Sequence, residues 1–240
     1  MEAPPNPALN TTGAGATVRF GYWSALATTV LTVVSFALAI TAVPDRVPYP
    51  YTSHVIAEQW PGDYLWMYPA MLLMVVFVAL SAAIHGYAPP SRKIYSLVGL
   101  CVAGLAAAIL LIDYYVQVTV MQPSLEKGQL DGWAMLTMYN PHGVFIALEE
   151  IGYLLISLAL LCLAAVFVGR NGLERGIRWL VTLSFAAVLL ALVAVAATRG
   201  IDRGDRFEII VISIVWLTLI VVGPLLAIVF RRAVRQSRAA

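Results

Sequence analysis

The chain has 240 residues, of which 61% are hydrophobic and only 12% are charged, and its formal net charge is +2. One soluble core of this size could not bury so many apolar side chains, whereas a lipid bilayer accepts them. The small net charge and the lack of interleaved basic and aromatic residues exclude nucleic acid as an expected partner. We therefore expect an integral membrane protein whose main partner is the lipid bilayer.

Six apolar stretches come near or exceed the roughly 20 residues that a helix needs to cross about 30 Å of hydrocarbon. Because unpaired backbone amides are excluded from hydrocarbon, each stretch is predicted to be a helix. The length of the first stretch favours a retained span over a cleaved signal sequence. The predicted fold is all-α, an integral membrane bundle of six transmembrane helices at 20–43, 65–86, 94–120, 141–168, 177–198 and 207–231.

The positive charges predict how the helices are oriented. Most of the 15 Lys and Arg residues lie on the cytoplasmic side if the N-terminus is cytoplasmic, as the positive-inside rule requires. We expect a multi-pass protein of the cell membrane, such as a bacterial inner membrane, with both termini inside. Residues 1–19 are predicted to be a flexible cytoplasmic tail, 20–231 the transmembrane domain, and 232–240 a basic cytoplasmic tail.

Two long outer loops, at about 44–64 and 121–140, end in similar sequence. Met67-Tyr68 precedes Pro69, and Met138-Tyr139 precedes Asn140-Pro141. The likeness suggests three hairpin repeats and predicts that the two loops lie side by side. Alternatively, the preference of Tyr for the headgroup level and of Pro for the first turn of a helix produces it without duplication.

Ionisable residues inside the spans stand out because each costs about 2.5–3.5 kcal/mol at a helix centre. Asp113 lies roughly 10 Å below the outer end of the third helix at 1.5 Å per residue. Glu149 lies roughly 12 Å below the start of the fourth helix, for which Asn140 is the expected N-cap and Pro141 the first turn. The two carboxyls therefore share a depth if these helices pack antiparallel.

Helical periodicity groups further polar residues around these carboxyls. His142, Glu149 and Tyr153 fall on one stripe of the fourth helix, and Gln117 shares a face of the third helix with Asp113. This pattern predicts an outward-facing polar pocket between the third and fourth helices. Its candidate ligand-binding residues are Asp113, Gln117, His142, Glu149, Glu150, Tyr153 and Arg199.

Three functions fit this cluster. In a purely structural or interaction protein, Arg199 pairs with Glu149 or Glu150, and Asp113 accepts hydrogen bonds from nearby tyrosines at 114, 139 or 153. In a binding or transport protein, the pocket takes a small or lipid-like ligand or an ion, with carboxylate protonation coupled to transport. In an intramembrane acid–base enzyme of the isomerase or cyclase type, a carboxyl exchanges a proton with an apolar substrate.

Cofactor and metal chemistry have little support in the sequence. His142, Glu149 and Asp113 could in principle hold a divalent ion, but no H-E-x-x-H or E-x-x-H pattern is present. The two cysteines, Cys101 and Cys162, fall inside spans and are expected to act as small apolar residues. Without a nucleotide-binding loop or dinucleotide fingerprint, we expect neither a metal nor a cofactor.

One set of segments resembles a known group of proteins. It runs from Asp113-Tyr114-Tyr115 through Gln122-Pro123-Ser124-Leu125 to Tyr139-Asn140-Pro141-His142-Gly143 and Leu148-Glu149-Glu150-Ile151-Gly152-Tyr153. These segments resemble uncharacterised bacterial multi-pass membrane proteins with six helices and no named activity. The resemblance implies no substrate, and the sequence predicts no oligomeric state.

Overall fold

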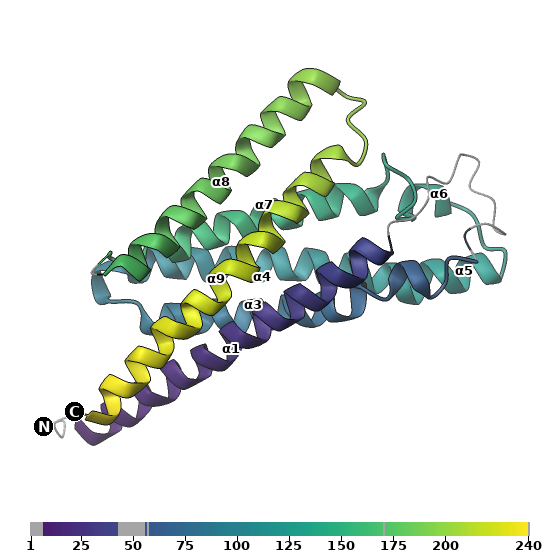
Figure 1. Cartoon of the computed structure of the whole chain (residues 1–240). Coiled ribbons are helices and arrows are strands. Elements are labelled where there is room, and N and C mark those ends of the chain that lie inside the picture. Colours follow the sequence, from purple (N-terminus) through teal and green to yellow (C-terminus); the bar gives the residue numbers. More distant parts are fainter. Residues whose placement is uncertain (1–6, 43–55, 57, 170, 240) are drawn as a thin grey trace, which may run out of the picture.

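The computed structural model describes residues 7–42, 56, 58–169 and 171–239, and these residues form helices joined by short turns, with no strand (Figure 1). The long helices are α1 (Pro7–Thr41), α3 (Met67–Tyr87), α4 (Lys93–Val116), α7 (Val144–Ala164), α8 (Gly172–Arg199) and α9 (Arg206–Ala239). The short elements are η1 (Gly62–Tyr64), η2 (Pro90–Arg92), the π-helical turn η3 (Gln117–Met121), α5 (Gln122–Glu126) and α6 (Trp133–Leu136).

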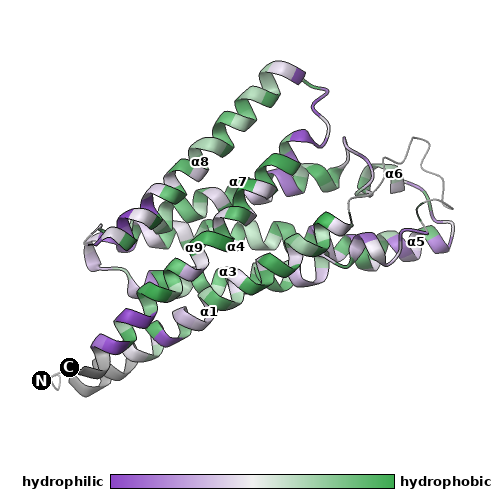
Figure 2. Cartoon of the chain, in the orientation of Figure 1, coloured by the Kyte–Doolittle hydropathy of each residue, from purple (hydrophilic) through white to green (hydrophobic). Residues whose placement is uncertain are grey.

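Within the described residues, six helical spans are long and apolar enough to cross a membrane. Hydrophobic residues fill the middle of the long helices, and hydrophilic residues gather toward their ends and the connecting turns (Figure 2). The predicted all-α bundle of six helices is thereby confirmed. α1 begins at Pro7, within residues 1–19 that the sequence assigns to a tail, and the division into tails and transmembrane domain stays a prediction.

The predicted start of the fourth transmembrane helix was wrong by a few residues. α7 begins at Val144, and the residue before it is Gly143 rather than Asn140. The Asn140 side chain instead donates to the Ala134 carbonyl at 2.8 Å and accepts from the His142 amide at 3.0 Å. An Asn side chain suits a turn as well as a helix cap, because it can hydrogen-bond nearby backbone in either place.

Small residues let α4 and α7 approach closely. A side chain added at Gly99 would meet Leu163 Cγ at 2.8 Å, and one at Gly152 would meet Leu110 Cδ2 at 2.6 Å. Along this antiparallel register Asp113 lies level with Glu149, as the depth argument predicts. Each predicted hairpin packs together, α1 with α3, α4 with α7 and α8 with α9, and α1 also packs extensively against α9.

The outer end of the bundle is closed by the segment between η3 and α7. Tyr139 donates a hydrogen bond of 2.9 Å to Asp63 Oδ2, and its ring contacts that of Tyr64. Burial and the neighbouring Asp63 carboxylate raise the pKa of Tyr139, so this phenol remains a donor. These contacts join the ends of the two long loops. Most of the first loop, 43–55, lies outside the described residues.

Candidate functional site: a buried carboxyl cluster

A chain of hydrogen bonds crosses the bundle from α9 to α4 and α7. Trp216 Nε1 donates to Tyr153 Oη at 3.0 Å, and Tyr153 Oη lies 2.9 Å from Tyr114 Oη. Tyr114 in turn donates to Glu149 Oε1 at 2.8 Å. All four side chains are buried, with Glu149 only 1% exposed.

The direction of this chain follows from the donors available. An indole N–H can only donate, and a tyrosine hydroxyl has one hydrogen to give. Because Tyr114 gives its hydrogen to Glu149, it must accept the hydrogen of Tyr153. Tyr153 accepts the indole hydrogen of Trp216. Every donor in this chain therefore points toward Glu149. The resulting hydrogen bond from Tyr114 holds Glu149 Oε1 in a fixed place.

Glu149 lies beside two other acidic residues from different helices. The carboxyls of Glu149 and Glu208, on α9, lie within hydrogen-bonding reach of each other. Asp113, on α4, is close enough to interact electrostatically with both. We call Asp113, Glu149 and Glu208 the carboxyl cluster. Two ionised carboxylates can only accept hydrogen bonds, so a bond between Glu149 and Glu208 requires a proton on one of them.

Asp113 is the least satisfied member of the carboxyl cluster. The residue is 3% exposed, and its Oδ2 atom has no hydrogen-bond partner among the described residues. The expectation that Asp113 accepts a hydrogen bond from Tyr114, Tyr139 or Tyr153 was wrong. Tyr114 donates to Glu149, Tyr139 donates to Asp63, and Tyr153 bonds to Tyr114. A buried, unpaired carboxyl oxygen costs stability, and such groups in native proteins call for an explanation beyond packing.

Aromatic rings surround the tyrosine pair. Trp66, at the start of α3, has its ring centroid 5.1 Å from that of Tyr114 and 6.0 Å from that of Trp216. The Tyr153 and Trp216 centroids are 6.0 Å apart. Phe36 of α1 contacts Trp216 at 5.7 Å. Five of the six long helices, all except α8, therefore contribute an aromatic side chain to this part of the core, with Trp66 placed just before the first residue of α3.

The predicted pairing of Arg199 with Glu149 or Glu150 was wrong. Glu150 forms its ion pair with Arg203, in the turn between α8 and α9. Arg199 is the last residue of α8 and is exposed. A positive-φ glycine, Gly200, ends α8, so the chain turns back and brings the later arginine over α7.

Two other candidate residues lie apart from the carboxyl cluster. His142 is exposed, and its Nε2 lies 3.3 Å from Asp202 Oδ1 in the α8–α9 turn. Gln117 donates to the Leu136 carbonyl at 2.6 Å and accepts from the Met138 amide at 3.1 Å, so it holds the outer segment in place. Of the predicted set, the structure brings together Asp113, Glu149 and Tyr153, with Glu150 beside them on α7.

Sequence reasoning missed Glu208, Tyr114 as the donor to Glu149, and Trp216 as a polar partner. Glu208 follows Asp202 and Asp205 closely, so the sequence alone does not distinguish it from the charges of the short turn before α9. Its place in the first turns of α9 was the available signal, since a carboxylate there can face a neighbouring helix. Within the described residues, no group of three His, Cys, Asp or Glu side chains has a geometry suited to a metal ion.

Comparison with known proteins gives no further assignment. A scan against protein families, a search of curated proteins and a search of solved structures each found no match. The function is therefore argued from the carboxyl cluster itself.

Proposed function

We propose that this multi-pass membrane protein binds or transports a small or lipid-like ligand carrying a positive charge, and that the carboxyl cluster exchanges a proton for that charge. The observation behind the proposal is the meeting of Asp113, Glu149 and Glu208 from three helices. Among the described residues no Lys or Arg forms an ion pair with any of the three. Buried acids without a basic partner favour either a proton or a cationic ligand.

The surrounding aromatic side chains support a cationic ligand. The faces of Trp and Tyr rings attract ammonium groups, most strongly where water is excluded. Tyr114 hydrogen-bonds Glu149, and the rings of Trp66 and Trp216 pack against Tyr114 and Tyr153. Because Asp113 and Glu149 are almost fully buried, a ligand reaches them only when the helices separate. The half-buried Glu208 and the Arg203–Glu150 pair lie on the side where such an opening would begin.

Native mass spectrometry of protein purified in mild detergent tests this proposal. Wild type is expected to retain a small cationic or lipid-like molecule that Glu149→Gln loses. Glu126→Gln is the matched control, since Glu126 is exposed at the end of α5 and lies outside the carboxyl cluster. Retention by the control and loss by Glu149→Gln supports binding. Equal retention by all three proteins contradicts it.

Transport is tested in proteoliposomes once that molecule is identified. Uptake should depend on a pH gradient, because one proton leaves the carboxyl cluster when the ligand charge enters. Asp113→Asn and Glu149→Gln should abolish this dependence while the proteins remain folded. Uptake that is the same with and without a gradient argues against proton exchange.

Replacing Asp113 separates binding from a purely structural role. Because its Oδ2 atom has no partner, Asp113→Leu should leave the midpoint of thermal unfolding unchanged or raise it. The same variant should lose the ligand. If the carboxyl cluster only specifies helix packing, Asp113→Leu should instead unfold at a lower temperature than wild type.

An intramembrane acid–base enzyme is the second candidate. The observation that favours it is the fixed orientation of Glu149 by Tyr114 and Tyr153, as expected of a group that transfers a proton to a defined atom. A purified sample would then convert a lipid-soluble substrate without any gradient. The remaining parts of the proposal, a bacterial inner membrane and cytoplasmic termini, come from the charge distribution and the sequence resemblance.

A further inference from the structure

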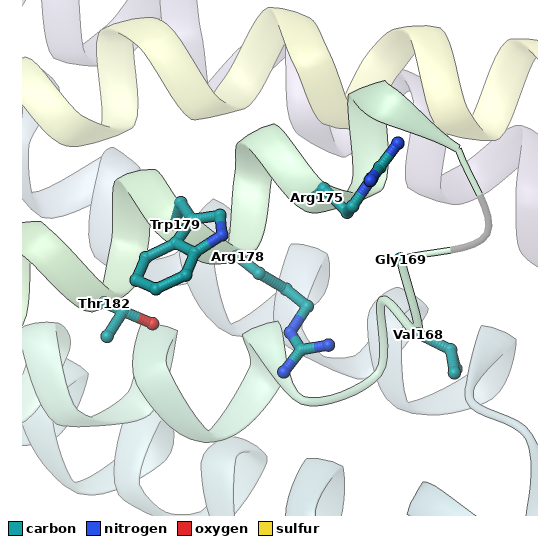
Figure 3. A pocket seen from close by; sticks show the side chains of 6 residues that line it. All are labelled: Val168, Gly169, Arg175, Arg178, Trp179 and Thr182. Atoms are coloured by element: carbon teal, nitrogen blue, oxygen red, sulfur yellow. The ribbon is translucent and has the colours of Figure 1, made fainter.

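A basic groove lies at the opposite end of the bundle, where α7 turns into α8. It has a volume of about 410 Å³ and is lined by Val168, Gly169, Arg175, Arg178, Trp179 and Thr182. This volume falls within the roughly 300–1,000 Å³ of small-molecule sites. Figure 3 shows Arg178 extending from α8 between Trp179 and the Val168–Gly169 segment. We call these six residues the basic groove.

Arg175 and Arg178 both pass close to Gly169, and their guanidinium groups point in different directions (Figure 3). A side chain at Gly169 would lie 3.0 Å from Arg175 Cγ and 3.9 Å from Arg178 Nη1. Among the described residues, neither guanidinium forms an ion pair or a hydrogen bond. The nearby Glu174 accepts from the Gly169 amide at 3.1 Å and from the Asn171 side chain at 3.3 Å. Within the part of the chain that the structure describes, the basic groove therefore holds two positive charges that no acidic side chain pairs with.

Helix length places the basic groove at the depth of the lipid headgroups. α8 has 28 residues, so at 1.5 Å per residue it is roughly 12 Å longer than the hydrocarbon core. Its first turns therefore lie outside the hydrocarbon. Arg175 and Arg178 are in these turns. Trp179, which is 65% exposed, has the character of a headgroup-level residue.

We propose that the basic groove binds the phosphate of an anionic phospholipid from the surrounding leaflet. A guanidinium presents paired donors that match phosphate oxygens, and two of them offset the charge of an anionic headgroup. Thr182 offers a further hydroxyl. Trp179, Leu183 and Leu190 are exposed and follow one another at helical spacing, so they form an apolar stripe along α8. An acyl chain of the bound lipid then lies along this stripe.

Lipid titration followed by native mass spectrometry tests this site in the delipidated full-length protein. Wild type should bind phosphatidylglycerol at least about tenfold more tightly than phosphatidylcholine, which corresponds to one charge-assisted contact. The double variant Arg175→Gln/Arg178→Gln should lose this preference. Arg231→Gln/Arg232→Gln is the control, because it removes the same charge from an exposed part of α9 at the same end of the bundle.

Three results would overturn the proposal. The first is a groove variant that still prefers phosphatidylglycerol over phosphatidylcholine as strongly as wild type. The second is an equal loss of this preference in both double variants, which indicates general surface charge. The third is displacement of the lipid by inorganic phosphate alone. If the groove variant does not fold, brominated phosphatidylglycerol provides a second measurement. It should quench wild-type fluorescence more than that of Trp179→Phe, whereas equal quenching contradicts a lipid beside Trp179.

Discussion

Tyr114 is the residue on which the hydrogen bonds of the carboxyl cluster depend. It donates to Glu149 and accepts from Tyr153, so it joins α4 to α7. Its ring also packs against Trp66 and Phe145. A change at Tyr114 therefore separates the contribution of the hydroxyl from that of the ring.

Tyr114→Phe should lower the free energy of unfolding by about 1–3 kcal/mol, because it leaves Tyr153 without an acceptor and Glu149 without a donor. Thermal unfolding in detergent measures the effect. The neighbouring Tyr115→Phe is the control, since Tyr115 is 61% exposed. Equal midpoints for the two variants would show that the hydrogen-bond chain does not stabilise the fold.

Depth and periodicity predicted three members of this network, Asp113, Glu149 and Tyr153. Buried charge is rare in hydrocarbon, so each acidic residue in a span carries information, and the assignment of these residues to a ligand site stays a prediction. The same reasoning assigned the basic partner of Glu150 to Arg199 instead of Arg203. A single sequence does not show how Gly200 turns the chain, and a shift of a few residues changes which arginine reaches α7.

At the scale of whole helices, the close contact of α4 with α7 determines where the carboxyls meet. Gly99, Ala103 and Ala107 form a stripe of small residues on α4, and all three are buried. The register of this contact brings Asp113 level with Glu149. Small residues also mark the crossing of α1 with α9, where a side chain added at Gly223 would meet the Ala25 carbonyl at 3.2 Å.

Gly99→Leu should destabilise the bundle by about 1–3 kcal/mol or more, because the new side chain meets Leu163 and the Ala159 carbonyl. Gly104→Leu on the same helix is the control, since nothing lies within 4 Å of a side chain added there. Chemical or thermal unfolding of the two variants gives the comparison. A loss of stability in Gly104→Leu equal to that in Gly99→Leu would contradict the packing described.

Arg203 fixes the turn between α8 and α9 to α7. Arg203→Gln should lower the free energy of unfolding by about 1 kcal/mol or less, since the arginine side chain is 38% exposed. It should also speed the exchange of backbone amide hydrogens in residues 200–205. Arg199→Gln removes the same charge without removing the ion pair. Faster exchange in the Arg199 variant than in the Arg203 variant would reverse the assignment.

At the scale of the whole molecule, both termini lie on one side of the membrane if all six spans found among the described residues cross it. The charge distribution predicts that this side is the cytoplasm. A protein with both native cysteines replaced, carrying Lys127→Cys or Gln236→Cys, tests the orientation with a membrane-impermeant maleimide applied to intact cells. Lys127→Cys should react and Gln236→Cys should not. The opposite pattern would reverse the orientation.

The composition was sufficient to predict the number of spans and the fold class, because the bilayer leaves only helices for such a chain. It was not sufficient for the arrangement of α8. This helix has the smallest buried share of the six spans and packs mainly on α9 and α7. Sequence gives each helix a hydrophobic length, but it does not show which neighbours cover it.

The hydrogen-bond chain that ends on Glu149 also restricts how protons travel through the molecule. Its first member, Trp216, is an indole N–H that cannot release its proton and be reprotonated in the way a hydroxyl or carboxyl can. The chain therefore cannot conduct protons through Trp216 toward Glu149. The groups beside Glu149 that can bind and release a proton are the carboxyls of Glu208 and Asp113, so a proton exchanged at Glu149 has to pass by way of these acids and not along the aromatic side of the core.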